Sequence, residues 1–119
     1  MFSFLENSID GHIHCCPHIN KRSTDIFEVI KLAEKNKMYA IGLMDNFSNT
    51  SGYASLVKKN FPNLNLKIFG GLIMEPPAGG VSYENAKISL EYSYFENDGA
   101  KFISFPTHHT RHIAIQEKR

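Results

Sequence analysis

Two histidines and an aspartate stand at alternate positions near the start of the chain. The segment IDGHIH contains Asp10, His12 and His14. In a strand, side chains at i, i+2 and i+4 share a face, so the two imidazoles would lie about 6 to 7 Å apart. Neutral imidazole binds zinc and other first-row metals, and a carboxylate can bind directly or orient a histidine. The spacing therefore predicts a metal site, with a polar strand edge as the alternative.

A second group of histidines occurs in the segment THHTRH near residue 110. It contains His108, His109 and His112, each of which could supply a further metal ligand or a proton-transfer group. His108 follows most closely on the strand that we expect before it. The alternative is a solvated terminus, because little sequence remains for this segment to pack against.

Several other polar residues are weaker candidates. Asp45 and Asn46 could bind a metal or activate water, but this pair more often turns the chain. Glu75 precedes two prolines, a position more typical of a solvated loop residue than of a catalytic acid. The adjacent thiols Cys15 and Cys16 are expected to be reduced, and small apolar packing suits them better than catalysis. His18 and Arg22, in the first loop, could contact a substrate, although surface residues of this kind usually have no specific role.

An alternation of strands and helices must position these residues. Hydrophobic periodicity and turn residues predict strands over 8–14, 39–44, 66–74 and 101–105, and helices over 25–37, 52–60 and 82–97. Asp25 and Ser82 are the expected helix caps, and the Gly70-Gly71 pair indicates a bulge or a close backbone approach. Such an order favours parallel strands joined by crossover helices, with the chemistry beyond their carboxyl ends. The clusters CCPH, DNFSNT, EPPAGG and THHTRH would then share one rim.

Composition limits the range of functions. The 119 residues include 13 basic and 12 acidic side chains, which are scattered, so we expect a small-molecule substrate and no nucleic-acid partner. The sequence contains neither an apolar run of about 20 residues nor an obvious secretion signal, so we expect no membrane association and a cytoplasmic location. We expect residues 1–119 to form a single domain.

Four segments of the sequence together resemble those of a known protein family. IDGHIH, AIGLMDNFSNTSGYASLV, IFGGLIMEPPAGGVSYENA and GAKFISFPTHHTRH together resemble the N-terminal half of an uncharacterised family of metal-dependent hydrolases in the amidohydrolase-like (β/α)8 superfamily. The likeness implies a partial TIM barrel of about four parallel strands and three crossover helices. It also implies that His12 and His14 are the first metal pair, and that the segment 108–112 lines the site. The runner-up is a phosphoesterase of the polymerase-and-histidinol-phosphatase type, from whose strand-two pattern Asn46 departs.

The implied function is hydrolysis by metal-activated water. His12, His14 and His108 are the candidate ligands, with zinc expected first and manganese or iron second. Asp10, His108 and His109 are the candidate catalytic residues. The alternative is a non-catalytic protein that binds a metal or a protein partner.

The length of the chain raises a separate question, because a closed barrel needs roughly 250 residues. We expect a truncated product. The alternatives are a half-barrel that closes as a homodimer through exposed sheet edges, or an open α/β domain with a lapsed site.

Overall fold

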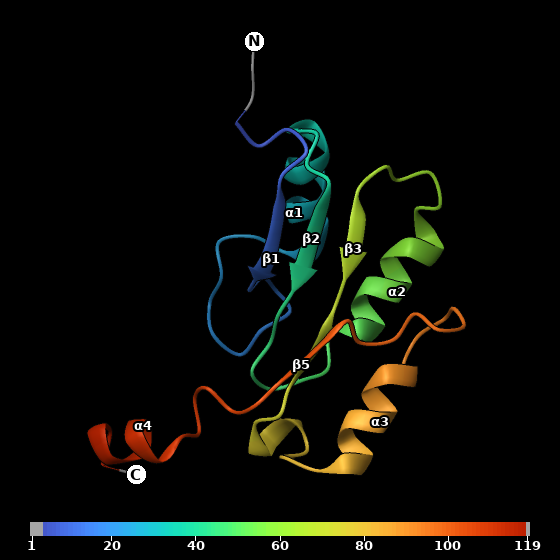
Figure 1. Ribbon diagram of the computed structural model, residues 1–119. Helices are drawn as coiled ribbons and strands as arrows, with labels where there is room; N and C mark the ends of the chain where they lie inside the picture. Colours follow the sequence, from blue (N-terminus) through green and yellow to red (C-terminus); the bar gives the residue numbers. More distant parts are fainter. Residues whose placement is uncertain (1–3, 119) are drawn as a thin grey trace.

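The computed structural model describes residues 4–118 and has a mixed α/β architecture with parallel strands (Figure 1). Its elements are, in chain order, β1 (Ile9–Ile13), α1 (Ile26–Lys35), β2 (Ala40–Leu43), α2 (Ser51–Asn60), β3 (Lys67–Phe69), β4 (Gly71–Ile73), the 3-10 helix η1 (Pro76–Ala78), α3 (Tyr83–Glu91), β5 (Phe102–Ser104) and α4 (Arg111–Gln116). The predicted order of strands and crossover helices is confirmed.

The strands form two parallel groups. β1, β2 and β3 pair in that order, with Ile9 opposite Ala40 and Ala40 opposite Lys67. β4 pairs with β5, with Gly71 opposite Phe102. Within residues 4–118 the strands do not close into a barrel: β1 and β3 are the edges of the three-stranded sheet, and β4 and β5 make up the two-stranded one. The parallel α/β class is thus confirmed.

The expected third strand, 66–74, is divided at Gly70 into β3 and β4. A Cβ at Gly70 would overlap the backbone carbonyl of Thr50, so only glycine allows this approach. Thr50 then joins the two strand groups. Its backbone N–H donates to the Gly71 carbonyl at 3.0 Å, and its buried hydroxyl donates to the Leu43 carbonyl at 2.7 Å. The predicted close approach at the glycine pair is confirmed, but the strand is not continuous.

The first helix begins as the sequence predicts. The Asp25 side chain accepts from the Glu28 backbone N–H, and the Glu28 carboxylate accepts from the Asp25 N–H, both at 2.8 Å. This reciprocal pair satisfies two donors that would otherwise lack partners at the helix start. The buried face of α1 packs in the main core with residues of β2, α2 and β3. Cys15 is buried in the same core, which confirms its expected packing role.

The third helix is shorter than predicted. Ser82 caps it by accepting from the Asn85 N–H at 3.0 Å, as expected, but α3 ends at Glu91 rather than near residue 97. Residues 92–98 instead turn back toward α2, where the Ser51 hydroxyl donates to the Tyr92 carbonyl at 2.9 Å. Gly99 does not end the helix directly. It lies so close to the Leu90 carbonyl that a Cβ would overlap it.

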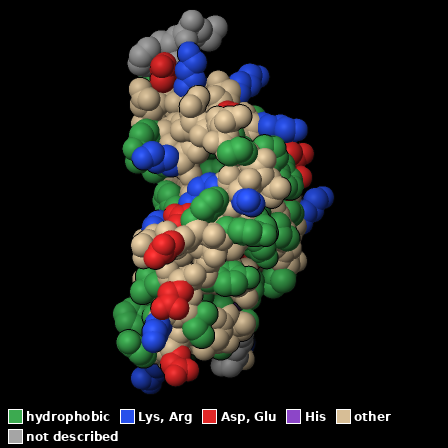
Figure 2. All heavy atoms as spheres, turned by 90° about the vertical axis from the view of Figure 1, so that its right-hand side faces the viewer, with side chains coloured by type: hydrophobic (Ala, Val, Ile, Leu, Met, Phe, Trp, Pro, Cys, Tyr) green, Lys and Arg blue, Asp and Glu red, His purple; other side chains and the backbone are tan. Residues whose placement is uncertain are grey.

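Figure 2 shows the face that α2 and α3 form, where charged side chains of both signs are interspersed with hydrophobic ones. No helix within residues 4–118 is long and apolar enough to cross a bilayer.

Candidate metal and proton-transfer site

The two histidines of the first strand converge. His12 lies in β1 and His14 directly follows it, so their side chains leave the same side of the chain. Their Nε2 atoms are 3.1 Å apart and their ring centroids 5.0 Å apart. The predicted convergence of these imidazoles is therefore observed.

The surroundings of His14 favour its neutral form. Burial, and then the positive charges of His12, Arg22 and His18, lower its pKa below the ordinary value of 6.5, against the opposing effect of Asp45. A neutral imidazole keeps one unprotonated nitrogen, which is the form that binds a metal. The other ring nitrogen, Nδ1, is buried and has no hydrogen-bond partner within residues 4–118.

The first loop adds a second polar group beside this pair. The His18 side chain is 1% exposed, and its Nε2 lies 3.2 Å from Arg22 Nη2 and 3.6 Å from Asp45 Oδ1. The Asp45 carboxylate also accepts from the Phe47 N–H at 2.9 Å and from the Ser48 hydroxyl at 3.0 Å. The expected turn-forming role of Asp45 is confirmed. Sequence reasoning gave His18 little weight, but the structure buries it between the first loop and the end of β2.

Glu75 organises the opposite side of the rim. It lies two residues after the end of β4, is 0% exposed, and accepts hydrogen bonds from the backbone N–H groups of Thr107, His108 and His109 at 2.8, 2.6 and 2.9 Å. The His109 ring adds a contact of 2.7 Å between its Nδ1 and Oε2. Burial alone would raise the pKa of Glu75, but these hydrogen bonds together lower it from 4.5 to about 2.

An ionised Glu75 fixes the state of His109. A carboxylate can only accept hydrogen bonds, so the Nδ1 atom of His109 must carry the proton that it shares with Glu75. In the neutral ring, Nε2 is then the unprotonated nitrogen. The His109 side chain is 28% exposed, so the ring is partly accessible from outside. The contact with Glu75 thus orients the His109 ring, with its Nε2 edge on the far side from the carboxylate.

The prediction that Glu75 is a solvated loop residue is wrong. Its place immediately after an apolar strand, at the same rim as the other clusters, was the available signal. Sequence alone could not show that the segment after β5 would fold its backbone N–H groups around this carboxylate. The histidine-rich segment is for the same reason not a frayed end at 107–109, and His112 lies farther on, in α4.

Asn46 and Phe47 connect the histidine side of the rim with the side that Glu75 organises. The Asn46 amide donates to Thr107 Oγ1 at 3.1 Å and to Glu75 Oε1 at 3.4 Å. The Phe47 ring contacts the His18 ring on one side and the His108 ring on the other, at centroid distances of 6.0 and 6.1 Å. The carboxyl ends of β1, β2, β4 and β5 therefore meet at one rim, as the sequence predicts.

Two candidate residues lie differently from the prediction. Asp10 Oδ1 accepts from the His12 backbone N–H at 3.1 Å, and among residues 4–118 Asp10 makes no hydrogen bond to an imidazole ring. The His108 ring packs against Phe47 and His109. Within residues 4–118, no group of three or more His, Cys, Asp or Glu side chains is arranged to hold a metal ion. The structure therefore does not bring His108 together with His12 and His14 as a third ligand.

The sequence matches one known protein family over nearly its whole length. The model described as "Family of unknown function (DUF6282)" matches residues 7–119. The chain belongs to this family. The matched region of the DUF6282 family includes the whole rim, from His12 to His109. No curated protein and no solved structure matches the chain.

Proposed function

We propose that this chain carries the metal site of a metal-dependent hydrolase of the amidohydrolase-like type. His12 and His14 would hold one divalent ion, with zinc as the first expectation and manganese or iron as the second. The observation that carries the proposal is the 3.1 Å distance between the two Nε2 atoms.

That distance fits a shared ion. Zinc lies about 2.0 to 2.1 Å from histidine nitrogens. Two nitrogens 3.1 Å apart at that bond length subtend an angle of about 100° at the ion, which suits both tetrahedral and octahedral coordination. The neutral state of His14 also supports ligation. Two protein ligands leave room for water or substrate, and for ligands outside the described residues.

The rest of the rim would handle protons. A bound divalent ion lowers the pKa of water and polarises a carbonyl or phosphoryl oxygen. Glu75 accepts from Nδ1 of His109 and orients the ring, so a neutral His109 would accept a proton at Nε2 from a group bound at the rim. Glu75 acts through His109 and does not itself face the substrate, because it is 0% exposed.

We also propose that the fold is the first half of a (β/α)8 barrel. The order β1-β2-β3 followed by β4-β5, with α1, α2 and α3 as crossovers, is the arrangement expected of the first half of a (β/α)8 barrel. The first and last strands, β1 and β5, would pair with a second half-barrel, in the same polypeptide or in a second copy.

Metal binding is tested first. The chain is stripped with a chelator, titrated calorimetrically with Zn²⁺, Mn²⁺ and Fe²⁺, and analysed for bound metal. We expect one equivalent of zinc per chain, and a loss of at least about tenfold in affinity on His12→Ala or His14→Ala. His112→Ala is the matched control, because His112 lies in α4, and it should bind as the unaltered chain does. Equal zinc affinity in all four proteins would refute the metal site.

Turnover is tested second, with p-nitrophenyl acetate and p-nitrophenyl phosphate as probes. Metal-dependent hydrolysis of the acetate supports the proposed class, and hydrolysis of the phosphate alone supports the phosphoesterase alternative. A chain that binds zinc through His12 and His14 but hydrolyses neither probe fits the non-catalytic alternative. His109→Ala should lower the rate while the zinc affinity stays the same.

A further inference from the structure

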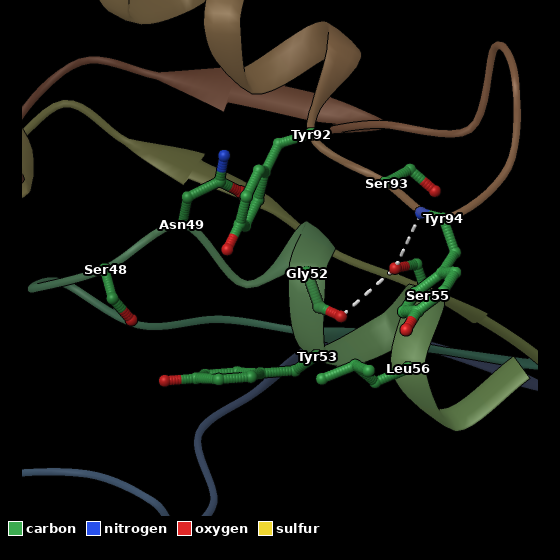
Figure 3. A pocket seen from close by; sticks show the side chains of 9 residues that line it. All are labelled: Ser48, Asn49, Gly52, Tyr53, Ser55, Leu56, Tyr92, Ser93 and Tyr94. Carbon is green, nitrogen blue, oxygen red and sulfur yellow. Dashed lines mark hydrogen bonds between the residues drawn. The ribbon is translucent and has the colours of Figure 1, made fainter. Parts of the chain in front are cut away.

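A pocket of about 560 Å³ opens between the start of α2 and the segment that follows α3 (Figure 3). Its walls come from residues 48–56 and 92–94, and none of the side chains that line it carries a charge. The volume lies within the range of about 300 to 1,000 Å³ that is typical of small-molecule sites. None of the rim histidines lines the pocket, although Ser48 and Asn49 connect it to the loop that carries Asp45.

The two walls are tied together without a ligand. The Ser51 hydroxyl donates to the Tyr92 carbonyl at 2.9 Å, and the Tyr94 N–H donates to Ser55 Oγ at 3.1 Å. The Tyr92 ring packs over the first turn of α2, where a Cβ at Gly52 would lie 2.5 Å from its Cε1 atom. A pocket held in this way does not have to be organised when a ligand arrives, which lowers the cost of binding.

The three serine hydroxyls of the pocket already have partners, and that of Ser93 accepts from the Phe95 N–H. Ser48 donates to Asp45, and Ser55 donates to the Gly52 carbonyl while it accepts from Tyr94. The polar groups without a partner among residues 4–118 include the hydroxyls of Tyr53 and Tyr92 and the amide nitrogen of Asn49. In Figure 3 the Tyr53 and Tyr92 rings lie on either side of Gly52, and both hydroxyls point toward the side of Ser48.

We propose that this pocket binds a neutral small molecule whose ring has an apolar face and hydrogen-bonding groups at its edge, as in a nucleoside or a glycoside. Tyrosine rings offer faces against which such a ring stacks, and their hydroxyls together with the Asn49 amide meet the polar edge. A charged group would gain no ionic partner among the lining side chains and would lose hydration. Binding here requires neither a metal nor hydrolysis.

The experiment titrates the metal-free chain calorimetrically with adenosine and, separately, with methyl β-glucoside. Saturable binding of at least one probe is expected, and the probe that binds identifies the source of the ring. Stacking on an aromatic ring contributes about 1 to 3 kcal/mol, so Tyr92→Ala should weaken binding by about 5- to 150-fold. Tyr83→Ala is the matched control, since Tyr83 is also an exposed tyrosine and lies outside the pocket.

Tyr53→Phe provides a second variant that keeps the ring and removes one hydroxyl, and it should weaken binding several-fold. Circular dichroism shows whether each variant is folded. The proposal is overturned if neither probe binds at about 10 mM, or if folded Tyr92→Ala and Tyr53→Phe both bind as the unaltered chain does. Tighter binding of adenosine monophosphate than of adenosine would also overturn it, because the ligand would then be an anion. None of these results depends on the zinc titration.

Discussion

Replacing Glu75 by glutamine should destabilise the fold strongly at neutral pH. The carboxylate is 0% exposed and accepts from three backbone N–H groups and the His109 ring. Its pKa in the folded chain is about 2, against 4.5 as the ordinary value. By linkage, this gap corresponds to about 3 kcal/mol of stability at pH 7 that comes from the ionised form. Glutamine cannot carry the charge, and its NH2 group would face donors.

The pH dependence has a definite sign. Because the pKa is lower in the folded state, the stabilisation is fully present above about pH 5 and is lost as the pH falls from about 4.5 toward about 2. At pH 3 it should have decreased to about 1.4 kcal/mol. The difference in free energy of unfolding between the unaltered chain and Glu75→Gln should therefore shrink as the pH falls.

Urea denaturation followed by circular dichroism, at pH 7 and at pH 3, measures this difference. Glu96→Gln is the matched control, because Glu96 is exposed in the segment after α3 and should change stability by less than about 0.5 kcal/mol. If Glu75→Gln were no more destabilising than Glu96→Gln at pH 7, the carboxylate would not organise the rim. A difference that grew toward pH 3 would contradict the assigned direction of the pKa.

Two further variants test the join between the strand groups by urea denaturation. Gly70→Ala should destabilise the chain by about 1 to 3 kcal/mol or more, because its Cβ would overlap the Thr50 backbone. Gly11→Ala is the control, since its Cβ would meet no atom within 4 Å and should cost far less. Equal effects of the two variants would show that the approach at Gly70 is not tight. Thr50→Val should cost about 1 to 3 kcal/mol, since the Leu43 and Gly71 carbonyls lose a buried donor, and a neutral result would mean that water replaces the hydroxyl.

Local signals were sufficient to predict the order of the elements. The Asp25 and Glu28 capping box, the apolar periodicity of α1 and the fully buried run of β2 are all encoded within a few neighbouring residues. The break at Gly70 and the early end of α3 depend instead on contacts between distant segments. Thr50 approaches Gly70 from another loop, and Ser51 holds the Tyr92 carbonyl 41 residues away. No local pattern contains that information.

In the candidate site, too, local patterns predicted some features, whereas others depend on contacts between distant segments. Alternation along a strand was enough to bring His12 and His14 together, because the period of a strand is fixed by its backbone. The environment of Glu75 depends on how the segment after β5 folds over the rim, and there sequence reasoning failed. Asp10 was expected on the same face as the histidines, but the register of β1 against β2 shifts between Asp10 and Ile13.

The asparagine at position 46 bears on whether the rim is an organised site or a decayed one. In the phosphoesterase pattern that this sequence partly resembles, a histidine ligand would stand there. A position that had simply lost a ligand would be expected to make no specific contacts across the rim. Instead, the Asn46 amide donates to both Glu75 and Thr107, and so joins the end of β2 to the ends of β4 and β5. An amide can supply two hydrogens to acceptors in this way, whereas a neutral imidazole has only one N–H to donate. Under the proposed function, this departure from the pattern serves the carboxylate that orients His109, because Asn46 supports Glu75 and Thr107 where a metal ligand would otherwise stand.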